Sequence, residues 1–243
     1  MRLILNLGLI ILLFAGPSEL YAQDISISLG EDGSLGARTI QLFLLVTVLS
    51  LAPGLAIMVT CFPFLVTVLS ILRQAIGLQQ SPPNMLIVSL ALFLTFFIME
   101  PVFTTAWTDG VRPFVENEIE AEAAVVRVLE PFRGFMASRL DEETFYSMLA
   151  LRPPDTEVTL GPDAPLSILV PSFLLSEIAR AFQIGFLIFL PFLIIDLVVA
   201  AVLMSMGMMM VPPAIVSLPF KLAFFVLADG WNLIATSLVR SYF

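Results

Sequence analysis

The sequence predicts an all-α protein whose apolar helices pair as hairpins and associate with a membrane. Hydrophobic residues make up 59% of the 243 positions, charged residues only 13%, and the mean hydropathy is +1.01. Because a soluble domain carries about 25% charged residues, this composition excludes a freely soluble protein. The charge distribution divides the chain into a signal peptide at residues 1–22, an apolar block at 38–100, an acidic segment at 101–164 and a second apolar block at 165–243.

Composition also excludes several functions. Eleven basic against twenty acidic residues give a net charge of −9, and without a basic cluster the chain has no surface for nucleic acid. The sequence has no His, which is the commonest general base and metal ligand. Its one Cys, Cys61, cannot form an intrachain disulfide or a thiolate metal site. We therefore expect no catalytic residue, no metal and no cofactor.

The N-terminus has the order of regions found in a secretory signal peptide. Arg2 precedes an apolar run, and the small residue Ala22 offers a cleavage site. An uncleaved anchor is the alternative, because Leu20 fits poorly the small residue usual two positions before the cleavage residue. In either case the next segment starts on the non-cytoplasmic side.

The first apolar block is too long for one membrane span. Between Arg38 and Arg73 lie 34 uncharged residues, roughly 51 Å as a straight helix, whereas a bilayer core is about 30 Å thick. Pro53-Gly54 and Pro63 lie inside this run, so we expect a kinked helix or a tight hairpin broken there. Pro82-Pro83 predicts the start of a second apolar helix.

The acidic segment carries most of the net charge. Residues 101–164 hold twelve acidic and five basic side chains, a net −7, against a net −2 in the rest of the chain. This balance predicts a polar, water-facing segment between two membrane blocks. Counting two conventional spans before it and two after it places the segment outside the cytoplasm.

Charged residues interrupt the second apolar block. A charge at mid-bilayer costs roughly 2.5–3.5 kcal/mol, so each should be paired, face water or lie outside the hydrocarbon. Glu177 and Arg180 are three residues apart and are neighbours on a helix, where an ion pair that only permits insertion is an equal alternative to a functional pair. Asp196 and Lys221 enclose 24 uncharged residues, and a hairpin would bring them together.

The predicted turn of that hairpin is rich in methionine. Gly207 and Pro212-Pro213 break the helix, and three flexible thioethers lie between them: Met208, Met209 and Met210. Repeated around a ring, such a turn would make a deformable collar that closes on itself and yields around a passing polypeptide. From the residues alone, ordinary packing is the simpler interpretation.

Two stretches of sequence resemble the FliP family of flagellar export-gate proteins, which is related to the SctR proteins of injectisomes. The first is LRQAIGLQQSPPN at residues 72–84. The second comprises, in order, ILVPSF at 168–173, SE at 176–177, AFQIGF at 181–186, PFLIID at 191–196, LMSMGMMMVPP at 203–213, LPFK at 218–221 and DGW at 229–231. The resemblance covers about residues 40–100 and 165–235.

The resemblance implies a non-enzymatic subunit of the flagellar export gate. In the family, five copies assemble with FliQ and FliR into a helical ring in the basal body at the inner membrane. FlhA and FlhB are further components, and unfolded flagellar proteins pass through the ring. The resemblance further implies that the methionines form a gasket around the channel and that the charges of Glu177, Arg180, Asp196 and Lys221 lie in subunit interfaces.

Three alternatives remain. The first is that the chain is the equivalent gate subunit of a virulence injectisome, although the signal peptide and the long acidic segment favour the flagellar branch. A small-solute transporter is another, but residues 40–100 and 165–235 show no repeated motif of the kind expected there. An intramembrane aspartyl enzyme would use Asp196 and Asp229, whose flanking sequences lack a shared catalytic motif.

Overall fold

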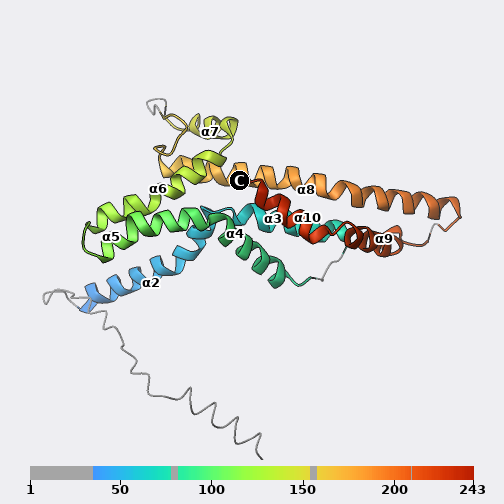
Figure 1. The fold of residues 1–243 in the computed structure, drawn as a ribbon, viewed down its shortest axis with the longest axis horizontal. Coiled ribbons are helices and arrows are strands. Elements are labelled where there is room, and N and C mark those ends of the chain that lie inside the picture. Colours follow the sequence, from blue (N-terminus) through green and yellow to red (C-terminus); the bar gives the residue numbers. More distant parts are fainter. Residues whose placement is uncertain (1–34, 78–81, 154–157, 209) are drawn as a thin grey trace, which may run out of the picture. The chain divides into compact units, whose positions relative to one another are not determined.

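The computed structural model describes residues 35–77, 82–153, 158–208 and 210–243. Over these residues it is helical with no strand, which confirms the all-α prediction (Figure 1). The predicted signal peptide at residues 1–22 and the predicted gasket residue Met209 lie outside the described residues. The chain separates into two units, Met1–Leu49 and Ser50–Phe243, and the helices that carry charge pairs belong to the second unit.

The first apolar block forms α2, Leu35–Met58, and α3, Phe62–Ile76. The structure corrects the break predicted at Pro53-Gly54, because α2 runs through both residues and ends at Met58. The turn falls at Thr60, whose Oγ1 donates to the Ile57 carbonyl at 2.7 Å and accepts the Phe62 N–H at 3.4 Å. Pro63 stands in the first turn of α3, where its missing N–H has no helical partner to lose.

The second apolar helix begins where Pro82-Pro83 predicts. Helix α4 spans Asn84–Ala106 and continues through the π-helical turn η1, Trp107–Val111, into α5, Arg112–Val115. The backbone is therefore helical from Asn84 to Val115, across the boundary drawn at residue 101. Gly110 in η1 lies against α6, where a Cβ atom would come within 2.9 Å of the Val128 backbone nitrogen. This close approach requires glycine.

The rest of the acidic segment forms α6, Ala121–Arg139, and α7, Glu142–Leu149. Asp141 caps α7 by accepting the Thr144 N–H at 2.9 Å, and that backbone hydrogen bond holds the pKa of Asp141 below its ordinary value. A small apolar core joins α6 and α7 to the start of α8. It is built from Met136, Phe145, Leu169 and Phe173, each no more than 1% exposed.

The second apolar block is a long hairpin. Helix α8, Leu166–Ser205, runs for 40 residues without interruption, which at 1.5 Å per residue is roughly 60 Å. Helix α9, Pro213–Leu227, returns from the turn, and α10, Gly230–Arg240, follows at an angle of 61°. Gly207 ends α8 at a φ of +75°, a conformation that favours glycine.

Helix α3 is the centre of the main core. Its side chains Phe64, Leu65, Leu69 and Leu72 are no more than 1% exposed and pack among residues of α4 and α8. Fully burying such a side chain contributes about 1.5–3 kcal/mol. The neighbouring helices thus turn one face to α3 and leave the other face open.

The sequence-based topology has two membrane spans before the acidic segment and two after it. The described residues contain fewer helices long enough to span a membrane. Asn84–Val115 and Leu166–Ser205 are long and apolar enough to cross a membrane, and α9 with α10 would make a third if the bent pair is one span. The stretch between Arg38 and Arg73, which that topology takes as one span, is instead divided between α2 and α3, and the 15 residues of α3 are short for a span.

The contact at Gly110 gives a test of how the acidic segment is held. Replacing Gly110 by Ala would place a methyl group 2.5 Å from Val128 Cγ2 and against its backbone, so we expect a destabilisation of about 1–3 kcal/mol through overpacking. Gly134→Ala in α6 is the matched control, because its Cβ would meet nothing within 4 Å. Limited proteolysis of α6 and α7 should accelerate in the first variant only, and equal protection in both would contradict the contact.

Candidate functional site

Lys221 joins three helices through one ammonium group. Its Nζ donates to Asp196 Oδ2 of α8 at 2.6 Å and to the Ala75 carbonyl of α3 at 3.2 Å. Ser217, one turn before it on α9, donates its hydroxyl to Asp196 Oδ1 at 2.5 Å. We call this set, Lys221, Asp196, Ser217 and the Ala75 carbonyl, the Lys221 cluster. The structure thus brings Asp196 and Lys221 together across the hairpin.

The position of Ala75 explains why a cation lies there. It is in the last turn of α3, where the terminal carbonyls lack helical partners and the helix dipole is negative. Lys221, only 5% exposed, therefore finds a carboxylate on one side and a helix C-terminus on the other. An amine in this place fixes the register of α9 against both α3 and α8.

Glu177 is the centre of a second buried cluster. Its carboxylate is completely buried, and Oε1 accepts from Arg180 at 3.5 Å, the neighbour predicted from the sequence. Arg139 at the end of α6 also donates to Oε1, at 3.4 Å, and Tyr242 donates its hydroxyl to Oε2. We call Glu177, Arg180, Arg139 and Tyr242 the Glu177 cluster.

Arg139 and Tyr242 were not predicted, and they lie 38 and 65 residues from Glu177 in the chain. The ring of Tyr242 stacks on Phe135 at 6.1 Å and meets Phe64 edge-on at 5.6 Å. The Arg139 guanidinium lies over the ring at 4.0 Å and donates to the Ser241 carbonyl at 2.9 Å. The segment after α10 is thereby fixed to α3, α6 and α8.

Two of the three methionines of the turn are described, and both are exposed. Met208 is 42% exposed and Met210 is 98% exposed, at the end of the hairpin formed by α8 and α9. The backbone of the turn is well supported, since the Gly207 N–H donates to the Met204 carbonyl at 3.1 Å and the Met208 N–H to the Leu203 carbonyl at 3.0 Å. Within the described turn, a hydrogen-bonded backbone carries Met210 almost fully exposed and Met208 partly exposed at the edge of the hairpin.

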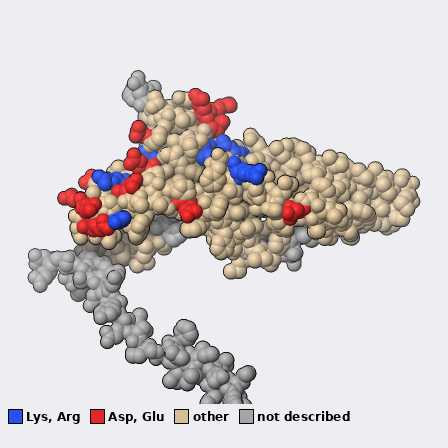
Figure 2. All heavy atoms as spheres, in the orientation of Figure 1, with Lys and Arg blue, Asp and Glu red and all other residues tan. Residues whose placement is uncertain are grey.

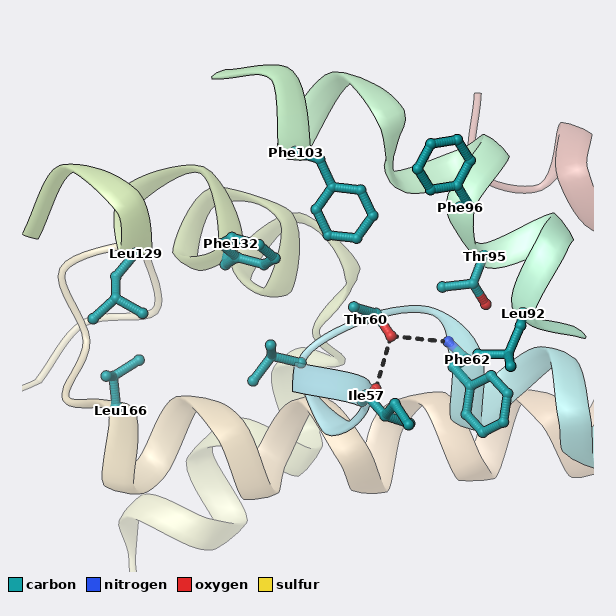
Figure 3. Close-up of a pocket in the computed structure, with 11 residues that line it drawn as sticks. Ile57, Thr60, Phe62, Leu92, Thr95, Phe96, Phe103, Leu129, Phe132 and Leu166 are labelled. Carbon is teal, nitrogen blue, oxygen red and sulfur yellow. Dashed lines mark hydrogen bonds between the residues drawn. The ribbon is translucent and has the colours of Figure 1, made fainter. Parts of the chain in front are cut away.

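Two apolar cavities lie beside these elements, and neither has a charged residue in its lining. One, about 710 Å³, lies between α8 and α9 near Met206 and Met208. The other, about 590 Å³, is shown in Figure 3, where Phe96, Phe103 and Phe132 surround it. Its two hydroxyl side chains, Thr60 and Thr95, bond to backbone carbonyls of their own turns. Both cavities suit apolar groups, since the two hydroxyls already use their donors on backbone carbonyls.

The described residues show no arrangement for catalysis at the two aspartates considered from sequence. Asp196 is paired with Lys221, whereas Asp229 accepts from the Asn232 side chain at 3.0 Å. In the same part of the chain no group of three or more Cys, Asp or Glu residues could hold a metal ion.

Comparison with models of known protein families shows which family the chain belongs to. The model of the FliP family matches residues 45–238. The chain belongs to the FliP family. The flagellar biosynthetic protein FliP of Agrobacterium fabrum is 49% identical over 93% of this chain and 90% of its own length. Those of Rhizobium meliloti and Bacillus subtilis are 50% and 46% identical, covering 87% and 90% of this chain and 86% and 98% of their own lengths. The FliP-family match includes the charged residues of both clusters and the methionine turn.

The Lys221 cluster can be tested with a pair of substitutions. Lys221→Met leaves Asp196 without its counterion, and breaking a buried pair costs roughly 3–5 kcal/mol. Because the Asp196 side chain is 31% exposed, we expect a loss at the low end of that range, seen as a lower unfolding temperature in detergent. Lys221→Met combined with Asp196→Leu removes both charges and should recover most of the stability. A double variant no more stable than the single one would contradict the pairing.

Proposed function

We propose that this FliP-family chain is a core subunit of the flagellar protein export gate, a channel through which unfolded flagellar proteins cross the inner membrane. The observation that carries the proposal is the FliP-family match over residues 45–238 together with relatives that are named flagellar biosynthetic proteins. In this proposal five copies form a ring with FliQ and FliR in the basal body, and FlhA and FlhB are neighbouring export components. The chain is a structural component of the gate and carries out no catalysis.

The open faces of the helices support an assembly. On α4 the exposed apolar side chains include Phe93, at 74%, and on α8 they include Leu187, at 64%. Figure 2 shows charged side chains gathered over α5, α6 and α7, whereas the far end of α8 and α9 is almost uncharged. Apolar patches of this extent mark contact with protein or lipid.

The length of α8 favours protein as the larger part of that contact. At roughly 60 Å it is about twice the thickness of a bilayer core, yet it is apolar along most of its length. Exposed apolar side chains occur from Leu175 to Met204, roughly 44 Å along the helix. A single crossing of lipid would leave many of them uncovered, and neighbouring subunits would cover them.

The methionine turn has a specific place in this proposal. Met208, Met209 and Met210 would meet their counterparts from other copies and close the conduit as a gasket. Unbranched thioethers fill irregular gaps and repack easily, so the closure would yield to a chain whose side chains change as it passes. The firm turn backbone and the outward side chains of Met208 and Met210 agree with this role.

The proposal is tested by isolating the tagged chain from its flagellated host. We expect it to purify in a large complex that contains FliQ and FliR, and we expect deletion of its gene to stop export of hook and filament proteins. A chain that runs alone or as a dimer, in cells that still export after the deletion, would refute the proposal.

The gasket makes a separate prediction. Replacing Met208, Met209 and Met210 together by Ala removes the flexible groups that fill the closure but leaves Gly207 and the prolines of the turn unchanged. We expect assembly of normal size and raised permeability to small ions and toxic solutes, measured as growth sensitivity and membrane depolarisation. Met85→Ala on α4, where the side chain is 80% exposed, is the control. Equal permeability in the triple variant and the control would contradict the gasket.

A further inference from the structure

Helix α10 carries a polar stripe on a part of the chain that is otherwise apolar. Asp229, Asn232, Thr236 and Arg240 are spaced three and four residues apart, so they share one face of the helix, and all four are exposed. The Thr236 hydroxyl donates to Asn232 Oδ1 at 3.1 Å, and Asn232 Nδ2 donates to Asp229 Oδ2 at 3.0 Å. Together with Ala228, Leu233 and Ser237, these groups line a shallow groove of about 280 Å³ that is partly polar and partly apolar.

The opposite face of α10 fixes the direction of this stripe. Leu238 is 2% exposed within the main core, and the Trp231 ring meets Phe225 of α9 edge-on at 5.4 Å. Gly230 lies so close to Phe225 that an added Cβ would overlap its ring. Beyond the helix, Tyr242 is held in the Glu177 cluster. With its apolar side held in three places, α10 has no freedom to turn the stripe inward.

Apolar side chains are exposed immediately before the stripe. Val226 and Leu227 at the end of α9 are 73% and 87% exposed. Past the 61° bend a carboxylate, an amide, a hydroxyl and a guanidinium are exposed, beside Leu233, which is 61% exposed. Ionised groups facing hydrocarbon are costly, so the stripe requires water or polar groups opposite it.

We propose that the polar face of α10 lines the water-filled conduit and meets the unfolded polypeptide as it passes. This inference rests on the proposed export function. The stripe fits such a partner because its two charges, Asp229 and Arg240, balance, and its amide and its hydroxyl both donate and accept hydrogen bonds. A shallow, neutral, hydrated wall exchanges hydrogen bonds with any backbone and holds no particular side chain.

The test uses single cysteines in the assembled gate of living cells. Asn232→Cys and Thr236→Cys place a thiol in the stripe, and Val226→Cys is a matched control at an exposed apolar position. The native Cys61 is fully buried and leaves a silent background. A charged thiosulfonate should modify the stripe cysteines about 100-fold faster than Cys at position 226, the factor that a charge loses in hydrocarbon.

A stalled export substrate then identifies what the stripe faces. We expect it to abolish modification at positions 232 and 236 but to leave a Cys replacing the exposed Glu120 of the acidic segment fully reactive. Stripe cysteines as slow as the one at position 226 would show that lipid or protein covers the face. Undiminished reaction with the substrate in place would show that the face lies on the bilayer surface. Either result overturns the inference.

Export by each variant is measured first, so that this inference and the export function fail separately. Normal export with unreactive stripe cysteines would overturn only the assignment of α10. A chain that never joins FliQ and FliR would overturn the export function itself. Ser237→Cys, exposed at the edge of the same groove, replaces any stripe variant that does not assemble.

Discussion

A positive charge inside an apolar protein needs partners on every side, and Lys221 obtains them from two other helices. The ammonium binds a carboxylate of α8 and a terminal carbonyl of α3, so the three helices meet in one register only. The Glu177 cluster imposes the same condition on α6 and on the segment after α10. Burial of α3 supplies the driving force for folding, and the two clusters decide how the helices are aligned.

This arrangement turns Glu177 and Lys221 inward and leaves many apolar side chains outward. The helices that cover α3 are left with exposed faces rich in Phe and Leu, and the hairpin of α8 and α9 ends in outward methionines. A chain built in this way is incomplete alone, because its largest apolar surfaces need other subunits or lipid. Membership of a family of flagellar biosynthetic proteins and the need for an assembly therefore lead to the same function.

The sequence predicted the features that depend on local chemistry or on chain direction. Prolines 82 and 83 marked a helix start, and the hairpin brought Asp196 to Lys221 because breakers lay between them. The break expected at Pro53-Gly54 was wrong, since an interior Pro53 is tolerated in an apolar helix. The break expected at Pro63 is confirmed, because the turn at Thr60 lies directly before it. Arg139 and Tyr242 could not be assigned to Glu177, because tertiary packing joins them and no sequence spacing records it.

The central claim is that other subunits cover the outward apolar faces of α4 and α8 while the two ionic clusters align the helices within each subunit. A cryo-electron microscopy map of the chain purified from its host tests this claim most directly. The account predicts a closed ring in which Phe93 and Leu187 are buried by neighbouring protein and each Lys221 bonds within its own chain. A solitary chain whose α4 and α8 faces are both surrounded by detergent would contradict it.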